Sequence, residues 1–462
     1  MLADLRKDTQ QIFQAGIKAA DPYLAVKKYL QFDEGQLVCR LDLNDKAIVR
    51  KKQWQKIYLV AFGKAACTMI KAAQEIIPAQ FLAGKAIAVT NYANVQKIEN
   101  IDVIGAGHPL ANQDGQAGAQ KIVEQVMLAQ QGDLVLVLVS GGGSALMPAP
   151  VSAISLEEKI MTTELLLGSG ATINEINCVR KHLSILKGGG LAKMIAPADL
   201  HALILSDVLD DDLGTIASGP TEVDSSTFAD ALKVLNDKKL CDKVPAAVQD
   251  YLKKGSSGQV SETPKSDDPC FNQVTHTLIG SNAISLQAIR QASASLGYDV
   301  FIYSEQLAGE AQKVAEELAL YAKNVIDKGI DKPCAILAGG ETTVTIQGTG
   351  QGGRNQEMAL AFVIAAEKYQ LKAEWCFLSA ETDGRDGPTD AAGGLVDTNA
   401  LERMHKAHIE AGLYLANNDS YHALQISEDL LMTGATGTNV ADLQILLIQP
   451  NTKISQPGDQ NV

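Results

Sequence analysis

Short runs of consecutive apolar residues alternate along the first half of the chain with stretches in which apolar residues recur at helical spacing. The apolar runs lie at 57–62, 86–90, 133–140 and 202–207. Helical patterns lie near 64–78, 113–129, 155–168 and 187–195. Continuous apolar runs are typical of strands that are covered on both faces. Their alternation with helices predicts an α/β fold with a mostly parallel sheet.

The same alternation restarts after a polar stretch, 255–269, that is rich in Gly, Ser and Pro and indicates a linker or long surface loop. Further strands are expected at 275–280, 299–303, 334–340, 342–348, 375–380 and 443–448. Further helices are expected at 282–296, 309–328 and 355–370. We therefore predict an N-terminal domain at 1–254, a linker at 255–272 and a smaller α/β domain at 273–462.

Composition narrows the class of partner. The formal net charge is −14, which argues against a broad basic surface for nucleic acid, although a small anion needs only local N–H groups and one or two cations. No apolar run approaches the roughly 20 residues of a membrane helix, and the N-terminus lacks an apolar signal core. The seven cysteines form no CxxC pair. We expect a cytoplasmic protein with a small-molecule partner, either alone or as a homodimer.

The first candidate for chemistry is the segment SGGGSA, 140–145, which directly follows an apolar run. Glycines let the backbone approach a ligand and turn its N–H groups toward a phosphate. The segment matches neither the P-loop nor the GxGxxG dinucleotide pattern. An ordinary tight turn explains the glycines equally simply. Its candidate ligand-binding residues are Ser140, Gly141, Gly142, Gly143 and Ser144.

Lys64 belongs to the segment GKAA, which begins where the run 57–62 ends. A lysine at that position is a compact cation suited to a phosphoryl group during transfer. A solvated lysine is the alternative. A second cationic segment, 174–192, contains Arg180 and Lys187 beside three consecutive glycines, but a helix with a cationic C-terminal end fits it as well.

In the C-terminal half, the segment GTGQGGRNQE leads through several glycines to Arg354 and a helix. Arginine offers a planar pair of donors for a carboxylate or phosphate. Asn355 and Glu357 fall in the first helical turn, where capping is a competing explanation. Upstream, CAILAGGETT places Gly340 and Glu341 at the end of another apolar run, as SGGGSA is placed. In both cases we expect ligand contacts beyond the carboxyl end of a strand.

Carboxylates gather in two loops that follow apolar runs. One loop, 379–394, contains Asp383, Asp386 and Asp390, and the other, 206–221, contains Asp207 and Asp210. Mg²⁺ takes one or two protein carboxylates together with phosphate oxygens, and a carboxylate can also accept a proton from a hydroxyl. Asp-Gly pairs are common in plain turns, which is the alternative.

Taken together, these motifs resemble one known family. The order GKAA, SGGGSA, RKHLSILKGG, SDVLDDD with ASGPT, GGETT, GGRNQE, TDGRDGPTDAAG and TGATGTNVAD is similar to that of the class II glycerate 2-kinases, from about residue 8 to 448. The resemblance implies a Rossmann-like N-terminal glycerate kinase domain, a C-terminal MOFRL domain and an active site in the cleft between them. It implies phosphorylation of D-glycerate at its 2-hydroxyl by ATP, giving 2-phosphoglycerate and ADP.

The resemblance also implies roles for single residues. The matching catalytic positions are Lys64, Arg354 and Asp383. Residues expected to bind substrate or nucleotide are Ser140, Gly141, Gly142, Gly143, Ser144, Arg180, Lys187, Asp207, Gly340, Glu341, Gly353, Asn355 and Glu357. The candidate ligands for Mg²⁺ are Asp383, Asp386 and Asp207. Asp210 stands where many family members have glycine, which adds a carboxylate to a loop expected to face the ligand.

Two other functions remain open at this point. The family has also carried the label hydroxypyruvate reductase, an NAD(P)H-dependent activity, but the chain contains no dinucleotide fingerprint. A non-catalytic protein that binds a nucleotide or anion would also use glycine turns. Dense Gly and Asp loops at several strand ends favour catalysis over binding alone.

Overall fold

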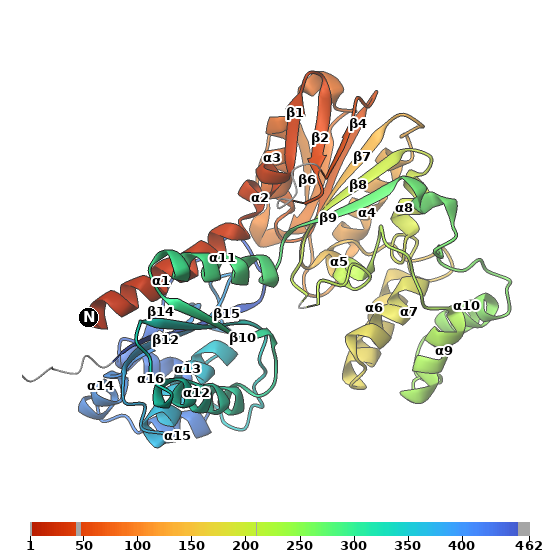
Figure 1. The fold of residues 1–462 in the computed structure, drawn as a ribbon. Coiled ribbons are helices and arrows are strands. Elements are labelled where there is room, and N and C mark those ends of the chain that lie inside the picture. Colours follow the sequence, from red (N-terminus) through yellow and green to blue (C-terminus); the bar gives the residue numbers. More distant parts are fainter. Residues whose placement is uncertain (1, 43–47, 209, 451–462) are drawn as a thin grey trace, which may run out of the picture. The chain divides into compact units, whose positions relative to one another are not determined.

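A computed structural model describes residues 2–42, 48–208 and 210–450. The chain divides into two compact units (Figure 1). The larger one, Asp21–Ser281, is called the large unit below. The other, called the small unit, combines Met1–Ala20 with Asn282–Val462.

The large unit is built on a parallel six-stranded sheet in the order β6-β5-β4-β7-β8-β9. Its strands are β4 (Ile57–Phe62), β5 (Ala86–Asn91), β6 (Ile101–Ala106), β7 (Leu134–Val139), β8 (Asp199–Leu205) and β9 (Val274–Gly280). A three-stranded antiparallel sheet consists of β1 (Leu30–Asp33), β2 (Gln36–Arg40) and β3 (Val49–Lys52). The predicted parallel α/β architecture is therefore confirmed for this unit.

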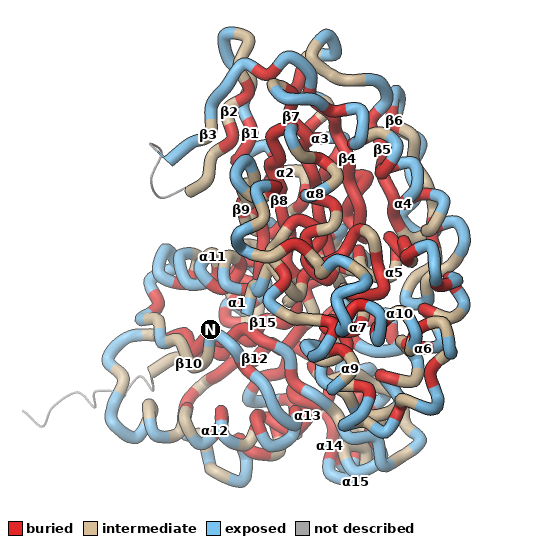
Figure 2. Tube along the Cα trace, turned by 90° about the vertical axis from the view of Figure 1, so that its right-hand side faces the viewer, coloured by how far each residue is buried: buried red, intermediate tan, exposed pale blue. Residues whose placement is uncertain are grey.

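Burial explains why its central strands are apolar throughout. Every residue of β4, β7 and β8 is buried, and these strands are red in Figure 2. Side chains alternate between the faces of a strand, so Val60 and Phe62 share one face of β4. They pack there with residues of α4 (Gln113–Val126) and α8 (Gly190–Ile195). Leu59 and Ala61 point to the opposite face and are equally buried.

The other helices of the large unit connect its strands or form a group after β7. They are α2 (Pro22–Tyr29), α3 (Ala66–Ile76), α5 (Gly143–Leu146), α6 (Leu156–Gly168), α7 (Ile173–His182), α9 (Phe228–Asp237) and α10 (Ala246–Ser256), with short 3₁₀ turns at Ala79–Phe81, Tyr92–Asn94, Ile216–Ser218 and Pro269–Gln273. Three of these helices begin with capping boxes, Ser155 with Glu158, Thr172 with Glu175 and Thr227 with Asp230. Each box satisfies free N–H groups in the first turn, which fixes where α6, α7 and α9 start.

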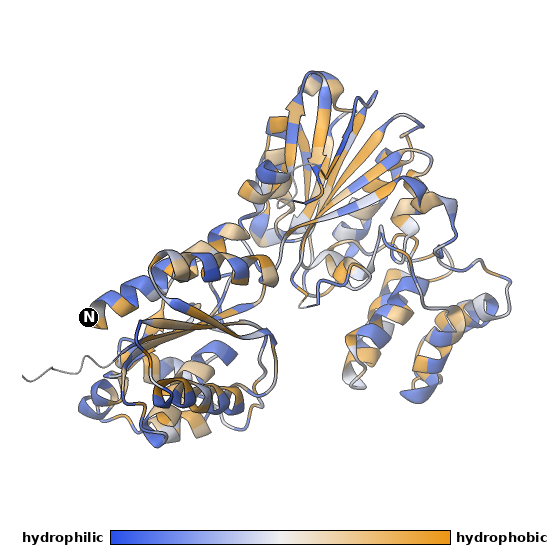
Figure 3. Ribbon diagram, in the orientation of Figure 1, coloured by the Kyte–Doolittle hydropathy of each residue, from blue (hydrophilic) through white to orange (hydrophobic). Residues whose placement is uncertain are grey.

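The small unit contains a mixed six-stranded sheet in the order β10-β11-β15-β12-β13-β14. Its strands are β10 (Asp299–Leu307), β11 (Cys334–Gly340), β12 (Glu374–Glu381), β13 (Gly393–Asp397), β14 (Leu430–Leu431) and β15 (Asp442–Gln449). Its helices are α1 (Leu2–Ala19), α11 (Asn282–Ser295), α12 (Ala311–Asp327), α13 (Arg354–Lys368), α14 (Ala400–Lys406), α15 (Ala411–Ala416) and α16 (Ser420–Ile426). In Figure 3, the central strand β7 of the parallel sheet is orange, whereas the edge strand β9 is paler.

The strands and helices expected from the apolar pattern are found, with one exception. Residues 342–348 form a loop instead of a strand. Asn418 Oδ1 accepts hydrogen bonds from the backbone N–H groups of Gln347 and Gly348, at 2.8 and 2.9 Å. Glu310 accepts another from Thr345 N–H at 3.1 Å. Side chains therefore satisfy backbone donors that a sheet would otherwise pair, and Ile346 is left exposed.

The two units also differ from the predicted domain boundaries. Residues 255–269 do form irregular structure after the end of α10, but they lie within the large unit, because β9 returns to pair with β8. Residues 1–20 belong to the small unit, because Leu5, Ile12 and Phe13 of α1 share its core. An apolar pattern marks the strand or helix, but it does not say which sheet will receive it.

Two further features concern membrane-spanning helices and disulfides. Within residues 2–42, 48–208 and 210–450, no helix combines the length and apolarity that a membrane crossing requires. All seven cysteines lie among the described residues and are free thiols.

Candidate active site

Two predicted turns of the large unit meet at the carboxyl end of its central strands. Phe62 of β4 pairs with Val139 of β7, and Lys64 and Ser140 follow these strands directly. The chain adds β5 and β6 on one side of β4, and then β7, β8 and β9 on the other. Such a reversal of strand order opens a crevice in which ligands of α/β sheets bind.

Backbone contacts hold these two turns together. The Lys64 N–H donates to the Gly141 carbonyl at 2.9 Å, and the Ala65 N–H donates to Ser140 Oγ at 3.0 Å. Gly63 adopts φ +120°, and a Cβ at this position would lie 2.2 Å from Ser140 Oγ. Only glycine tolerates both the backbone angle and the close approach. Gly63 therefore lets Lys64 lie beside the glycine turn.

The glycine turn packs between a histidine and a carboxylate. A Cβ on Gly141 would lie 2.2 Å from Asp207 Oδ2, and one on Gly142 would lie 2.9 Å from the His108 ring. Burial lowers the pKa of His108, and the nearby charge of Lys64 lowers it further. Across the described part of the chain, Lys64 Nζ has neither a hydrogen-bond acceptor nor an ion-pair partner. Its ammonium is thus available to a ligand at the switch point.

Lys187 lies behind this turn and is almost completely buried. Its Nζ donates to Ser144 Oγ at 2.9 Å, to the Ser144 carbonyl at 3.1 Å and to the Ala217 carbonyl at 3.3 Å. Ser144 Oγ lies 2.9 Å from Ser218 Oγ, which donates to Asn177 Oδ1. Burial lowers the pKa of Lys187 well below its usual value, and the charges of Lys159 and Arg180 add to this effect.

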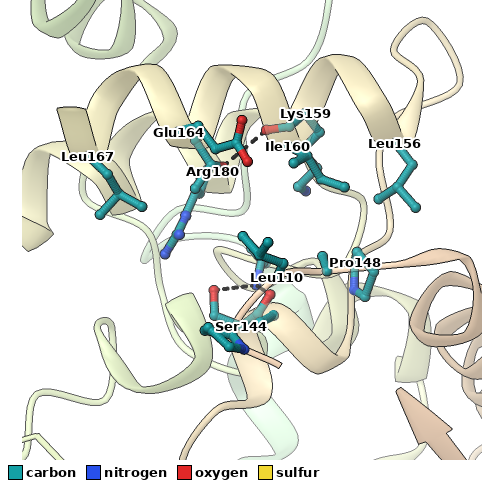
Figure 4. A pocket seen from close by; sticks show the side chains of 14 residues that line it. Leu110, Ser144, Pro148, Leu156, Lys159, Ile160, Glu164, Leu167 and Arg180 are labelled. Atoms are coloured by element: carbon teal, nitrogen blue, oxygen red, sulfur yellow. Dashed lines mark hydrogen bonds between the residues drawn. The ribbon is translucent and has the colours of Figure 1, made fainter. Parts of the chain in front are cut away.

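Arg180 and Ser144 line the same pocket, which lies beneath α6 (Figure 4). Arg180 belongs to α7, and Lys187 follows that helix. The structure thus places Ser144, Arg180 and Lys187 around one hollow, as ligand-binding residues should be. Lys159 of α6 also lines the pocket and was not predicted. Its helical spacing carries no sign that distinguishes it from a surface lysine.

In the small unit, Arg354 is the first residue of α13 and stands among carboxylates. Its Nε and Nη2 donate to the two oxygens of Asp442 at 2.7 and 2.8 Å. Glu341 lies 3.3 Å from Nη1, and Glu381 lies 3.3 Å from Nη2, the nitrogen that also donates to Asp442. Burial lowers the pKa of Arg354, but the hydrogen-bonded Asp442 and the two glutamates outweigh it and raise the pKa overall.

For the carboxylates of this cluster, burial outweighs the effect of the neighbouring guanidinium on the pKa. Burial raises the pKa of Glu381 to about 8, with Arg354 opposing the shift and neighbouring carboxylates adding to it. Burial also raises the pKa of Asp442 to about 7, although Arg354 binds it through two hydrogen bonds. A single guanidinium is shared by three carboxylates, so the cluster lacks positive charge. Neither Glu381 nor Asp442 was predicted from the sequence to be a site residue. Glu381 lies in the loop 379–394, and Asp442 is the last residue of the segment TGATGTNVAD.

Asp386 has a structural role that the sequence did not predict. It is fully buried, and its oxygens accept the backbone N–H groups of Asn355 at 3.2 Å and Gln356 at 2.8 Å. It therefore caps the N-terminus of α13, and Gly353 is needed because a Cβ there would lie 2.3 Å from the same carboxylate. These contacts give Asp386 a structural role in addition to the metal ligation predicted for it.

Asn355 and Glu357 also point into the protein. Asn355 Oδ1 accepts a hydrogen bond from Ser379 Oγ at 2.6 Å. Glu357 accepts hydrogen bonds from Gln312 at 2.9 Å and from Asn418 at 3.0 Å, and it is buried. Both residues hold the turn that presents Arg354.

The remaining predicted residues of the small unit lie at strand ends. Gly340 ends β11, and a Cβ on it would lie 2.2 Å from backbone atoms of Leu307. Asp383 follows β12, where its oxygens accept the Arg385 N–H at 2.8 Å and a longer bond from Asn439 at 3.4 Å. Asp383 is half-buried. It lies two residues from Glu381, whose pKa its charge raises.

The structure thus groups the predicted residues in two sets. Lys64, the 140–144 turn, Arg180, Lys187 and Asp207 belong to the large unit, and Gly340, Glu341, Arg354, Asp383 and Asp386 to the small unit. Among the residues that the structure describes, no group of three or more His, Cys, Asp or Glu side chains is placed to hold a metal ion. The three predicted metal ligands are divided between the units.

Comparisons with known proteins agree with these two sets. Residues 8–253 match a family described as a domain of unknown function, DUF4147, and residues 334–442 match the MOFRL family. A glycerate 2-kinase from Pyrococcus horikoshii is 40% identical, over 96% of this chain and 98% of its own. A putative hydroxypyruvate reductase from Agrobacterium vitis is 35% identical, over 96% and 94%.

Solved structures give the same result. The crystal structure of glycerate kinase from Thermotoga maritima matches with a TM-score of 0.85 and 38% identity, over 96% of this chain and 100% of that one. Identity of this level across nearly the full length of both chains establishes common descent. The chain belongs to the glycerate kinase family whose members combine a DUF4147 domain with a C-terminal MOFRL domain.

Proposed function

We propose that this protein transfers the γ-phosphoryl group of ATP to the 2-hydroxyl of D-glycerate, giving 2-phosphoglycerate and ADP. The observation that carries the proposal is the switch point, where the unpaired ammonium of Lys64 lies beside the glycine turn 141–143. A cation next to backbone without side chains suits a phosphate. The glycerate 2-kinase among its relatives supports the choice of acceptor.

Phosphoryl transfer asks the protein mainly to position the reactants and neutralise charge. In the reaction, the 2-hydroxyl oxygen forms a bond to the γ-phosphorus while the bond to the bridging oxygen of ADP breaks, and the hydroxyl proton leaves to a base. We assign Lys64 to stabilise charge on the transferred group. The backbone of Gly141–Gly143 holds phosphate oxygens, and Asp207 supports the turn by packing against Gly141.

The small unit supplies Arg354 and Asp383. Asp442 fixes the orientation of the guanidinium through two hydrogen bonds to Nε and Nη2, and Nη1, which lies 3.3 Å from Glu341, is the nitrogen that we assign to bind a phosphate or carboxylate. Asp383 orients the attacking hydroxyl or accepts its proton. Both units are needed in this proposal, because each holds part of the catalytic set.

The cluster around Arg354 also suits Mg²⁺. Three carboxylates share one guanidinium, and burial, with neighbouring carboxylates adding to it, raises the pKa of Glu381 and of Asp442. Mg²⁺ needs few protein ligands, because phosphates and water supply the others. Asp383 and Glu381 would hold it in the small unit, with Asp207 a candidate in the large one. When bound with the nucleotide, the ion neutralises phosphate charge.

The test is to incubate the purified protein with ATP, Mg²⁺ and D-glycerate and to identify the product by phosphorus NMR. We expect the 2-phosphate, formed with one ADP per turnover. A 3-phosphate product would change the assigned acceptor oxygen. ATP binding without any phosphoglycerate would instead identify a nucleotide-binding protein.

The name of the Agrobacterium vitis relative makes hydroxypyruvate reduction the second function to test. The chain lacks the GxGxxG fingerprint that NAD(P)H binding commonly uses. We therefore expect no oxidation of NADH or NADPH with hydroxypyruvate at enzymatic rates. Such oxidation would overturn the kinase proposal. We also propose a cytoplasmic location and, as an assembly to be measured, a homodimer.

A further inference from the structure

A pocket of the large unit lies beneath α6 and has a wall of unusual charge (Figure 4). Its polar lining comes from Ser144, Lys159, Thr163, Glu164, Arg180 and Lys187, and its apolar lining from Pro109, Leu110, Ala111, Ala145, Pro148, Leu156, Ile160 and Leu167. Three of the polar residues are cations. Glu164, which is exposed, is the only carboxylate among the lining residues.

These cations have few partners. Lys159 is buried, and its Nζ donates to the Leu183 carbonyl at 3.1 Å. Lys187 donates only to neutral oxygens of Ser144 and Ala217. The guanidinium of Arg180, half-buried, has no hydrogen bond or ion pair within residues 2–42, 48–208 and 210–450. Over the same residues, Glu164 forms no ion pair with any of the three.

Burial and mutual repulsion oppose the charge of all three groups. Burial lowers the pKa of Lys159 to about 7, and the charge of Arg180 contributes. Burial also lowers the pKa of Arg180. An unpaired buried charge destabilises a protein, whereas an apolar residue at the same place would not. This arrangement is unfavourable for stability alone, and a bound anion would relieve it.

The rest of the pocket is apolar. Leu110 and Leu167 lie at its mouth with 61% and 58% of their surface exposed. Ile160 and Leu156 continue the apolar wall from α6. D-glycerate carries polar groups on all three carbons and has no apolar face to place here. The preferred ligand therefore has both an anionic part and an apolar, flat part.

The pocket also borders the glycine turn at Ser144. Ser144 lines it and directly follows the glycine turn, and its hydroxyl is bonded to Lys187. An elongated anion could therefore lie on the glycine turn at one end and in the pocket at the other.

We propose that this pocket binds the purine and the adjoining phosphates of the nucleotide donor. The base lies against Leu110 and Leu167, and the phosphates face Arg180, Lys159 and Lys187. The assignment rests on the proposed kinase function for the identity of the donor. The proposed kinase function leaves open where the nucleotide binds, and this assignment places it in the pocket of the large unit. Lys159 and Arg180 then bind the donor and not D-glycerate.

Two substitutions separate the charged from the apolar contribution. Affinity is measured by calorimetry for ADP and, separately, for inorganic tripolyphosphate. Arg180→Met should weaken both ligands at least tenfold. Leu167→Asn, which adds no charge, should weaken ADP at least fivefold but leave tripolyphosphate within twofold, because only ADP carries a base. Leu167 is exposed, so this variant should fold even if the other does not. The matched controls are Arg290→Met on α11 and Leu413→Asn on α15, both exposed positions outside the pocket.

Turnover of ATP and D-glycerate is measured with the same wild-type preparation. It distinguishes failure of the pocket assignment from failure of the proposed kinase function. If the wild type is active but both pocket variants bind ADP as it does, the pocket assignment is wrong while the kinase function stands. A rise in the KM for D-glycerate with unchanged ADP affinity would move the pocket to the acceptor. If the wild type binds ADP through the pocket but forms no phosphoglycerate, the pocket stands and the kinase function is wrong.

Discussion

Charge at single side chains differs between the two units in a way that fits their proposed ligands. In the large unit, Lys64 and Arg180 have no acidic partner among the residues described, and Lys187 donates only to neutral oxygens. In the small unit, Arg354 is shared by three carboxylates. The first arrangement favours a phosphate and the second a divalent cation.

Lys64→Ala tests the charge at the end of β4. Loss of a donor that acts on the transition state typically lowers kcat by about 10²–10³. We expect that loss in steady-state phosphorylation of D-glycerate, with normal thermal unfolding. The control is Lys71→Ala. Lys71 lies on α3, the helix that begins two residues after Lys64, and this variant should keep full activity. Turnover close to wild type in the Lys64 variant would exclude the assigned role.

Lys159→Met tests the buried charge through stability. The pKa of Lys159 is about 7 in the folded protein and near 10.5 when unfolded. Between these values the unfolded chain binds more protons, so the stability of the wild type rises with pH. We therefore expect the variant to be more stable at pH 6.5 and its advantage to shrink at pH 9.5. Urea midpoints at the two pH values measure this. An advantage independent of pH would show that the pKa of Lys159 is the same in the folded and the unfolded protein, so that Lys159 is fully charged in both near neutrality.

At the scale of elements, turns and helix ends position the predicted site residues, and these turns and ends require particular residues themselves. Gly63 and Gly142 adopt left-handed backbone angles beside neighbouring atoms, and Asp386 caps the helix that begins at Arg354. A larger side chain at either glycine would displace Ser140 or His108. These residues therefore support the site without touching a ligand.

Asp386→Ala measures the contribution of the helix cap. The substitution removes both acceptors from two buried N–H groups at the start of α13, and we expect a loss of about 2 kcal/mol in the free energy of unfolding. Asp390→Ala, an exposed aspartate of the same loop, should change it by less than about 0.5 kcal/mol. Chemical denaturation gives both values. Equal effects would indicate that capping does not explain Asp386.

The strands and the turns that follow them could be predicted because their signal is local in the sequence. The runs 57–62 and 133–140 predict β4 and β7, because full burial requires continuous apolarity. The same argument places Lys64 and Gly141 at strand ends. Lys159 and Asp442 were missed, because their importance depends on partners far away in the sequence. The placement of α1 and β9 was missed for the same reason.

At the scale of the whole molecule, the chain builds one unit from both of its ends. The small unit takes α1 from the N-terminus, where Leu5, Ile12 and Phe13 are buried against α11 and the sheet. The large unit has separate cores of its own. Units with separate cores are expected to unfold in separate steps, so one overall free energy of unfolding would not describe the protein.

Phe13→Ala distinguishes the two units during unfolding. Removal of a buried phenylalanine costs about 3–5 kcal/mol, and here the loss falls on the small unit although the residue is near the N-terminus. The chain has two tryptophans, Trp54 in the large unit and Trp375 in the small unit, so Trp54→Phe and Trp375→Phe leave one reporter each.

In urea, the Phe13 substitution should lower the midpoint reported by Trp375 and leave the midpoint reported by Trp54 unchanged. Leu252→Ala, in a core of the large unit, should have the opposite pattern. If Phe13→Ala instead lowers both midpoints equally, the units unfold as one. The N-terminal helix would then stabilise the whole protein, because loss of the small unit's core would remove the large unit's fold as well.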